Sequence, residues 1–514
     1  MSRINTNVQS LVAQRVLGQN NNALTSALTR LSTGLKINRG KDDPAGLIAS
    51  ENLRSELKAI DTAISNSERA DQVVNIAEGG LQEVSGLLTE LQGLLTASAN
   101  KAGLSASERE ANQSQIDSIL QTIDRIASAT SFQGIKLLNG NFDYGVSAIA
   151  DGITDYRING AKFDSSSLDV NVLVTQSAQQ AGMYLSFGAG ALDLGGANSS
   201  FTIEIAGALG SRELTFSSGT SLDTVVASIN SFTEVTGVTA SVSAGTGIRL
   251  ESRDFGSSKF VSVKIIDDGG LDTTGTTNEG IYTLQAQNAG AANTTRTAQF
   301  SDSLANNGIT DYGQDLGATI NGVTATSNGK TARINTDFLD VEITLSTGEA
   351  QELGTVDGPT TGAPAFTITG GGADFQLAGR VDIAGKVSIG ISDVATRKLG
   401  NNTTGFLDGL SSGKAFNVVN GNTTTAQEIV AKAIEQVSGL RGRLGAFQKN
   451  TIGATIRSLG ISAENTQAAE SVIRDTDFAG ETARLTRSQI LVSSSTNVLA
   501  LANAQPQSVL SLLG

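Results

Sequence analysis

The 514-residue chain contains no cysteine, no histidine and no tryptophan. Without cysteine it can form no disulfide bond, no thiolate nucleophile and no thiolate metal site. Without histidine it also lacks the commonest general base and the commonest nitrogen ligand for metals. Carboxylate chemistry stays formally open, but most enzyme designs are excluded. We therefore expect no catalytic residue, no cofactor-binding residue and no metal ligand.

Long apolar runs are absent as well. No stretch approaches the length that a bilayer span needs, and no charged, apolar, small-residue leader opens the chain. We expect no membrane insertion, and any export must proceed without a cleaved signal of that type. A hydrophobic content of 39% still suffices for packed cores. The length predicts about three or four domains.

Negative charge is concentrated in the middle of the chain. The net charge is −14; residues 141–420 hold 15 Lys and Arg against 29 Asp and Glu, and the two ends hold 21 of each sign. This distribution suits ends that pack against copies of themselves and a middle that faces water. It argues against a nucleic-acid partner, which requires a basic surface.

The carboxyl-terminal stretch from 474 to 514 has the spacing of a helix that hides one seam against a partner helix. Large apolar residues recur every seven positions, with a second row beside the first. The helix also contains Ser493, Ser494 and Ser495, so it should be marginal alone. The two rows are Leu485, Val492 and Leu499, and Leu491 and Val498.

Residues 1–43 form a similar weak helix with an apolar stripe and few other apolar residues. We expect it to be the partner of the carboxyl-terminal helix, with a pair of independent surface helices as the alternative. Its stripe alternates steps of four and three through Leu24, Leu28, Leu31 and Leu35.

Stronger helices lie inside these ends. Asp43 and Pro44 predict a helix start, as cap and first residue, and Ser105 with Glu108 predicts a capping box. A hairpin is expected at 134–138, with its turn at Asn139–Gly140. The helices share a sustained three–four alternation, which predicts a bundle. Its core candidates are Leu53, Leu57, Ile60, Leu81, Val84, Leu88, Ile116, Ile123, Val437, Leu440 and Leu444.

The region from about 142 to 413 differs in composition and in the pattern of its apolar residues. Short β-prone runs at 201–205, 261–266 and 341–345 alternate with Gly, Ser, Thr, Asn and Asp clusters, and one helix is expected at 222–229. The fold class is therefore multidomain α + β, in which paired terminal helices and a helical bundle carry a β-rich insertion.

At both ends the residues resemble the bacterial flagellins, the subunits of flagellar filaments. The resemblance covers roughly the first 140 and the last 90 residues, and the 201–266 stretch is similar to an insert module of flagellins. The matching segments are INTN at 4–7, RLSTGLKIN at 30–38, KDDPAGL at 41–47, FQGIKLL at 132–138, DTDFA at 475–479, SQIL at 488–491 and ANAQPQSVLSLL at 502–513.

The resemblance implies a structural subunit that polymerises with itself into the extracellular filament for swimming. An inner domain (1–43 with 471–514) would line the central channel, a bundle with a hairpin (44–165 with 415–470) would surround it, and a variable β-rich region (166–414) would project outward. The implied partners are other copies, the type III export apparatus, a flagellin chaperone, the filament cap and hook-associated proteins. The chain would be secreted.

One stretch departs from the family. Many flagellins carry an Arg after a Leu–Gln pair, and an animal Toll-like receptor reads the patch that this Arg leads. Here the stretch is Leu91, Gln92, Gly93, Leu94 and Leu95, so glycine replaces the guanidinium. We expect weak or no activation of that receptor. Bundle packing is the simpler role for its leucines.

Four other functions are weighed against the filament subunit. A hook-filament junction protein shares the helical ends in diluted form. A flagellin-borne zinc protease needs a His-Glu-x-x-His helix, which a chain without histidine cannot form. The pair Asp267–Asp268 could suggest a calcium or glycosidase site, but Asp-Asp-Gly-Gly is more typical of a turn. An adhesive role of the outer region stays open.

Overall fold

The computed structural model describes residues 6–100, 103–163, 167–188, 190–194, 199–243, 247–271, 279–285 and 288–513. The chain divides into two compact units. One comprises Met1–Val74, Phe375–Lys386 and Gly445–Gly514, and the other Asn75–Asp374 and Val387–Leu444. The first unit therefore unites the two ends of the chain. No helix within the described ranges combines the length and the apolar character that a membrane span requires.

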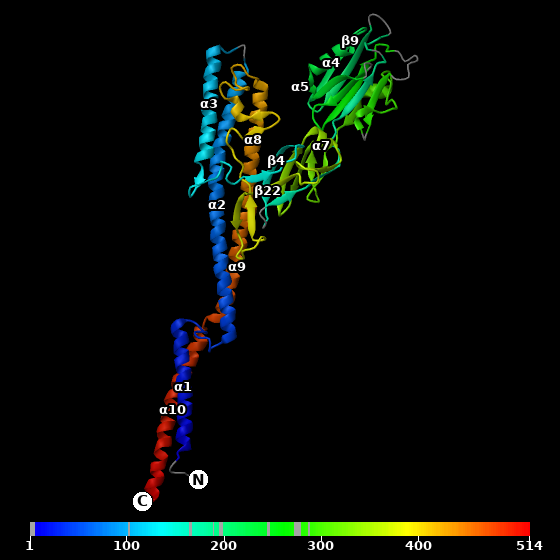
Figure 1. Cartoon of the computed structure of the whole chain (residues 1–514). Helices are drawn as coiled ribbons and strands as arrows, with labels where there is room; N and C mark the ends of the chain where they lie inside the picture. The colour runs from blue at the N-terminus through cyan, green and yellow to red at the C-terminus, as the bar shows by residue number, and fades with distance from the viewer. Residues whose placement is uncertain are drawn as a thin grey trace. The chain divides into compact units, whose positions relative to one another are not determined.

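Helices form most of the first unit, and two of them are the chain's terminal helices (Figure 1). Apolar residues three and four positions apart account for the α-helices of this unit. Its helical elements are α1 (Val8–Thr33), the first part of α2 (Pro44–Ser98), a π-helical turn (Phe447–Ile452), α9 (Gly453–Arg474) and α10 (Phe478–Leu513).

Side chains and one glycine fix the ends of α1 and the start of α2. The Asn7 side chain accepts the N–H of Ser10 at 3.0 Å, and Gly34 ends α1 with φ of 73°, which suits glycine. Asp43 Oδ1 accepts the N–H of Gly46 at 2.9 Å, so the predicted cap of α2 is confirmed.

The helical part of the second unit contains the rest of α2, α3 (Ala106–Ala129) and most of α8 (Thr423–Ala446). The capping box is confirmed, since Ser105 N donates to Glu108 Oε2 at 2.7 Å and Glu108 N donates to Ser105 Oγ at 3.3 Å. Arg441 Nε of α8 donates to Glu78 Oε1 of α2 at 2.8 Å. This charged pair joins two helices that are far apart in the sequence.

The hairpin turn lies earlier than predicted. Strands β1 (Ser131–Phe132) and β2 (Ile135–Lys136) are joined by Gln133 and Gly134, with φ of 48° and 84°. A two-residue turn with positive φ at both positions matches the twist of a hairpin. The predicted turn at Asn139–Gly140 is therefore wrong, because that dipeptide follows the second strand.

The β-rich region has two hydrophobic cores, and its named sheets are antiparallel where their pairing is described. The first core lies between the sheets β10-β11-β7-β13-β14 and β15-β12-β8-β9, with α4 against it. Phe187, Phe201 and Phe300 form an aromatic cluster in it, with ring centroids 5.1 to 5.6 Å apart. Its elements are β7 (Gly182–Ser186), β8 (Ser200–Gly207), β9 (Gly210–Ser217), α4 (Leu222–Asn230), α5 (Thr233–Thr236), β10 (Val238–Ser243), β11 (Gly247–Ser252), β12 (Phe260–Asp267), β13 (Gly280–Gln285), β14 (Asn288–Ala292), α6 (Ser303–Asn307) and β15 (Ile309–Tyr312).

The second core lies among the sheets β17-β16-β6-β21, β18-β19-β20-β4 and β3-β22-β5. Alternation of buried and half-buried residues along β20 is the period of a strand with one apolar face. The elements are β3 (Tyr144–Ser147), β4 (Ile153–Ala161), β5 (Leu168–Val170), β6 (Val172–Gln176), β16 (Gly317–Ile320), β17 (Val323–Thr324), β18 (Thr326–Asn328), β19 (Thr331–Asn335), β20 (Leu339–Leu345), α7 (Thr347–Gln351), β21 (Gly354–Val356) and β22 (Phe366–Gly371).

Shorter elements follow the second core. They are β23 (Ala373–Gln376), β24 (Lys386–Ile389), β25 (Gly400–Asn401), β26 (Gly405–Phe406) and a 3₁₀ turn (Leu407–Leu410). The predicted multidomain α + β class, with paired terminal helices and a β-rich insertion, is confirmed.

Candidate self-assembly surface on the terminal helices

Helices α1 and α10 lie side by side over most of their length (Figure 1). Polar side chains link them at intervals: Asn7 Nδ2 donates to the carbonyl of Ala502 at 2.7 Å, and Asn20 Nδ2 donates to Ser495 Oγ at 2.6 Å. Where the helices meet the rest of their unit, Thr476 N donates to the carbonyl of Gly34 at 2.9 Å. The two ends of the chain are thus partners, as predicted.

Small side chains, rather than leucines, form the seam between these helices. On α10 the buried positions recur every seven residues, and on α1 the buried seam includes two alanines. Small side chains allow two helices to approach closely but remove little apolar surface from water. Apart from the larger Glu481 of α10, the seam residues are small: Ser488, Ser495 and Ala502 on α10, and Ser10, Ala13 and Ala27 on α1.

The rows of large apolar residues predicted from the sequence lie beside this seam or face outward. In the described chain Leu28 is 48% exposed, Leu491 43% and Val498 54%. The other members are half-buried: Leu24, Leu31, Leu35, Leu485, Val492 and Leu499. Glu481, Ser488, Ser495 and Ala502 have the same spacing of seven as the predicted row Leu485, Val492 and Leu499, but the sequence analysis did not select them because it followed residue size.

One charged group is buried in the seam. The Glu481 side chain is only 7% exposed, and it lies 3.1 Å from Arg484 of its own helix and 3.8 Å from Arg30 of α1. A carboxylate removed from water requires such partners. The contact with Arg30 favours one register of α1 against α10, because sliding by a turn would leave the buried carboxylate with only Arg484 of its own helix.

Large apolar side chains remain exposed on both terminal helices. Contiguous exposed apolar residues mark surfaces where proteins associate. We name this set the assembly surface: Val8, Leu11, Val12, Val16 and Leu28 on α1, and Ile490, Leu491, Val498 and Leu501 on α10.

The candidate bundle residues occupy less exposed positions. Leu81, Val84, Leu88, Ile116, Ile123, Val437, Leu440 and Leu444 are at most 3% exposed, and Ile60 is also buried. Leu53 and Leu57, in the first unit, are half-buried. The buried members of this set pack inside their own units, whereas Leu53 and Leu57 keep part of their surface in water.

The stretch that departs from the flagellin pattern lies on α2. Leu91 and Leu95 are buried, Gln92 and Leu94 are half-buried, and Gly93 is exposed. A Cβ atom at Gly93 would meet no atom within 4 Å. The outer face of α2 therefore has room for a side chain at the position where this chain has none.

The acidic pair Asp267–Asp268 is engaged in a turn. Its carboxylates accept the backbone N–H groups of Gly269 at 3.0 Å and Gly270 at 3.2 Å. Such bonds from Asp to the backbone two residues on are typical of turn chemistry. Across the described residues, no group of three His, Cys, Asp or Glu side chains is placed to hold a metal ion.

Comparison with known proteins matches both helical ends. The family described as the bacterial flagellin N-terminal helical region matches residues 4–143, and the C-terminal helical region matches 427–513. The flagellin hook IN motif matches residues 200–254, within the first β core.

Whole-chain relatives agree with these regions. A flagellin of Salmonella typhimurium is 29% identical over 522 residues, and a B-type flagellin of Pseudomonas aeruginosa is 28% identical over 532, each alignment covering 99% of both chains. Among solved structures, FlgL of Xanthomonas campestris has 12% identity and a TM-score of 0.25, covering 80% of this chain and 98% of that one. The FliD D2-D3 domains of Serratia marcescens have 18% identity and a TM-score of 0.25, covering 42% and 98%.

At these TM-scores the two solved structures add nothing to the assignment, which follows from the family regions and the full-length relatives. A chain with flagellin regions at both ends, and aligned with flagellins over 99% of its length, is not better explained as a hook-filament junction protein. The chain belongs to the bacterial flagellin family and is a structural subunit of the flagellar filament.

Proposed function

We propose that α1 and α10 become ordered when subunits assemble, and that they form the innermost layer of the filament around a central channel. The observation that supports this is the assembly surface. A single chain leaves these leucines, valines and isoleucine in water, whereas neighbouring copies in a helical polymer would cover them.

Energetics support the coupling of folding to assembly. Fixing the backbone of one residue costs about 1–2 kcal/mol, and isolated helices are marginal in water. Burial of the seam contributes little stabilisation, because each buried alanine methyl contributes only about 0.8 kcal/mol. Covering an exposed Leu or Val of the assembly surface contributes about 1.5–3 kcal/mol. The neighbours, rather than the single chain, therefore supply most of the stabilisation.

The remaining parts have distinct roles in this proposal. The inner domain comprises 1–43 with 471–514, the surrounding bundle 44–165 with 415–470, and the outer region 166–414. An outward position suits the outer region because it carries most of the excess of negative charge, which favours contact with water over contact with other copies.

The proposal includes the route by which the subunit reaches the filament. The chain would be held by a flagellin chaperone, exported by the flagellar type III apparatus and assembled outside the cell beneath a cap, on hook-associated proteins. Its role is structural and not enzymatic. A carboxyl-terminal helix that is marginal alone suits both chaperone capture and passage as an unfolded chain.

Hydrogen exchange tests this coupling directly. In the monomer, amides of α1 and α10 should exchange close to the rate of an unfolded chain. In the filament their protection should rise on the order of 1,000-fold or more, because local opening then costs about 4 kcal/mol. Amides of residues 81–95 in the bundle, protected in both states, are the internal control. Equal protection of α1 and α10 in the monomer would refute the proposal.

We further propose that this flagellin activates the Toll-like receptor weakly, because Gly93 supplies no guanidinium. Gly93→Arg should restore activation. It should also raise the free energy of unfolding by about 0.8 kcal/mol, since glycine is a poor helix residue and the site is open. Receptor reporter assays and urea denaturation measure the two effects. Gly86→Arg is the matched control: it is also exposed and open on α2, so it should stabilise equally without raising activation.

A further inference from the structure

A four-stranded sheet of the second unit, β18-β19-β20-β4, turns a charged face away from its apolar core. Cross-strand pairing aligns Arg333, Glu342 and Arg157 in one row across three strands. The next row is Thr331, Thr344 and Asp155. Such a face normally meets bulk water.

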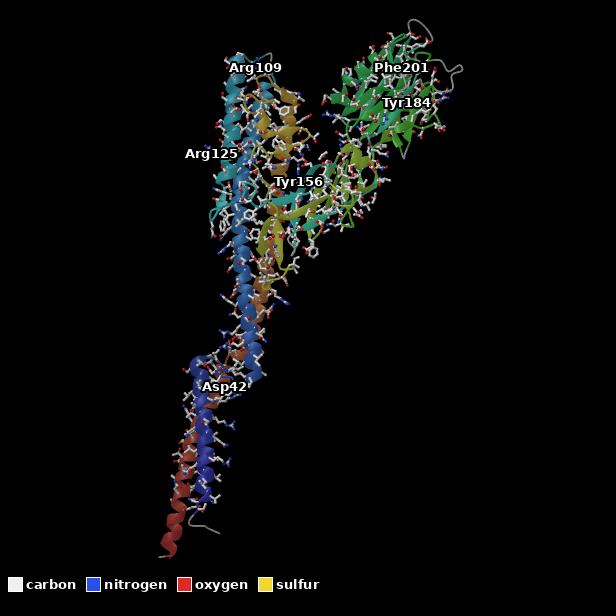
Figure 2. All side chains as sticks on the ribbon, viewed as in Figure 1. Asp42, Arg109, Arg125, Tyr156, Tyr184 and Phe201 are labelled. Atoms are coloured by element: carbon white, nitrogen blue, oxygen red, sulfur yellow. The ribbon has the colours of Figure 1, made fainter. Side chains whose placement is uncertain are left out.

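Here α8 and residues 399–402 cover part of this face. A cavity of about 440 Å³ lies between it, α8 and the 399–402 loop, and a second hollow of about 540 Å³ adjoins it, sharing Arg157, Arg333 and Glu342. Tyr156, labelled in Figure 2, lies on β4 and lines the first cavity. Both volumes fall within the roughly 300–1,000 Å³ of small-molecule sites, but the lining is more polar than usual.

Most charges around the cavity are already paired. Arg333 donates twice to Asp340, at 3.2 and 3.1 Å, and Arg157 lies 3.6 Å from Asp155. On α8, Lys432 Nζ lies 2.7 Å from Glu435. Just before residue 399, Arg397 lies 2.6 Å from Asp393. Burial raises the pKa of Asp143, and the positive charge of Lys398 opposes that rise.

Arg443 and Glu342 are the exceptions. Over the part of the chain that is described, neither side chain has an oppositely charged group within 4 Å, and Arg443 Nη1 is enclosed without a hydrogen-bond partner. Burial lowers the pKa of Arg443 to about 10, with repulsion from Arg333 and Arg157 acting in the same direction and Asp340 and Glu342 opposing it. Arg443 therefore brings a donor without a partner to the wall of the cavity, and Glu342 brings a carboxylate that no ion pair neutralises, among side chains of both signs.

We propose that this cavity binds a saccharide. Sugar hydroxyls both donate and accept hydrogen bonds, so one ligand can donate to Glu342 and accept from the guanidinium of Arg443. The hydroxyl-bearing side chains of the adjoining hollow, among them Thr326, Thr331 and Thr403, supply further partners. A simple anion would meet Glu342, Asp155 and Glu435, and a simple cation would meet three arginines. A neutral ligand with many hydroxyl groups avoids both conflicts.

Saturation-transfer difference NMR on the full-length chain tests the proposal. The probes are glucose, galactose, mannose and N-acetylglucosamine, with glucuronate and inorganic sulfate as anions. At least one neutral sugar should give a saturable signal. Arg443→Met, which keeps an unbranched apolar stem but lacks the guanidinium, should weaken that binding about tenfold or more, because it removes a charged donor.

Control variants make the result decisive. Arg125→Met removes an exposed arginine of α3 (Figure 2) and should leave binding unchanged. Thr403→Val removes an exposed hydroxyl at the rim and should weaken binding about threefold without affecting folding, so it carries the test if Arg443→Met proves unstable.

Each remaining outcome overturns the proposal. Absence of saturable binding by any neutral sugar contradicts it. Binding of glucuronate and sulfate alone would make the cavity an anion site. Sugar binding that survives in both Arg443→Met and Glu342→Gln would place the ligand elsewhere on the chain.

Discussion

Removal of residues 475–514 is expected to give a folded, soluble monomer that no longer forms filaments. The deletion takes away α10, and with it the four α10 residues of the assembly surface and the only described helix that pairs lengthwise with α1. The two β cores and the bundle residues of the second unit lie outside the deleted segment. Circular dichroism should therefore show a cooperative unfolding transition close to that of the full-length monomer.

Electron microscopy and sedimentation velocity measure the loss of assembly. Full-length protein, polymerised under the same conditions, is the control and should form long filaments. A truncated chain that still grew filaments would show that α10 is dispensable, and the proposed inner layer would then be wrong. A truncated chain that failed to fold would instead contradict the independence of the second unit.

The double substitution of Leu28 and Leu491 by serine should weaken assembly strongly while sparing the monomer. Leu28 is 48% and Leu491 43% exposed in the single chain, so the two substitutions together should change the monomer's free energy of unfolding by no more than about 1 kcal/mol. In the filament each buried leucine contributes about 1.5–3 kcal/mol. The critical concentration for polymerisation should therefore rise at least 100-fold.

Pelleting assays over a series of protein concentrations give this value. Leu304→Ser is the matched control, because Leu304 is 51% exposed on α6 of the β-rich region and lies outside the assembly surface. It should leave the critical concentration unchanged. An unaltered value for the Leu28/Leu491 variant would mean that these side chains stay in water in the filament.

Features that depend on neighbouring residues alone could be predicted from the sequence. The cap at Asp43, the capping box at Ser105 and Glu108, and the helix near 222–229 each follow from local chemistry, and each is present. The helix–strand–helix order followed from a change of apolar period. The hairpin turn was misplaced because Asn139–Gly140 has the commoner turn composition, while Gln133–Gly134 has the required conformation.

Features that depend on distant parts of the chain were harder to predict. Spacing predicted that α1 and α10 would pair, but not that serine and alanine would be among the most deeply buried residues between them, because these side chains carry no hydrophobic signal. The cavity over the β18-β19-β20-β4 sheet could not be predicted at all. It arises only when α8, from near the end of the chain, covers strands that begin at residue 153.

The π-helical turn at Phe447–Ile452 lies where the spacing of buried residues along the helix becomes irregular. Buried positions of α8 follow steps of three and four as far as Phe447, and the next, Ile452, comes five residues later. Within this turn Gln448 donates to Asp71 of α2 at 2.8 Å. Each residue of an ordinary α-helix rotates the chain by roughly 100° about the helix axis. The wider turn of the π-helix accommodates one extra residue, so the faces of α9 keep their direction relative to α8. An insertion or deletion here would therefore act as a rotation, turning every side chain of α9 about its axis while hardly altering its length.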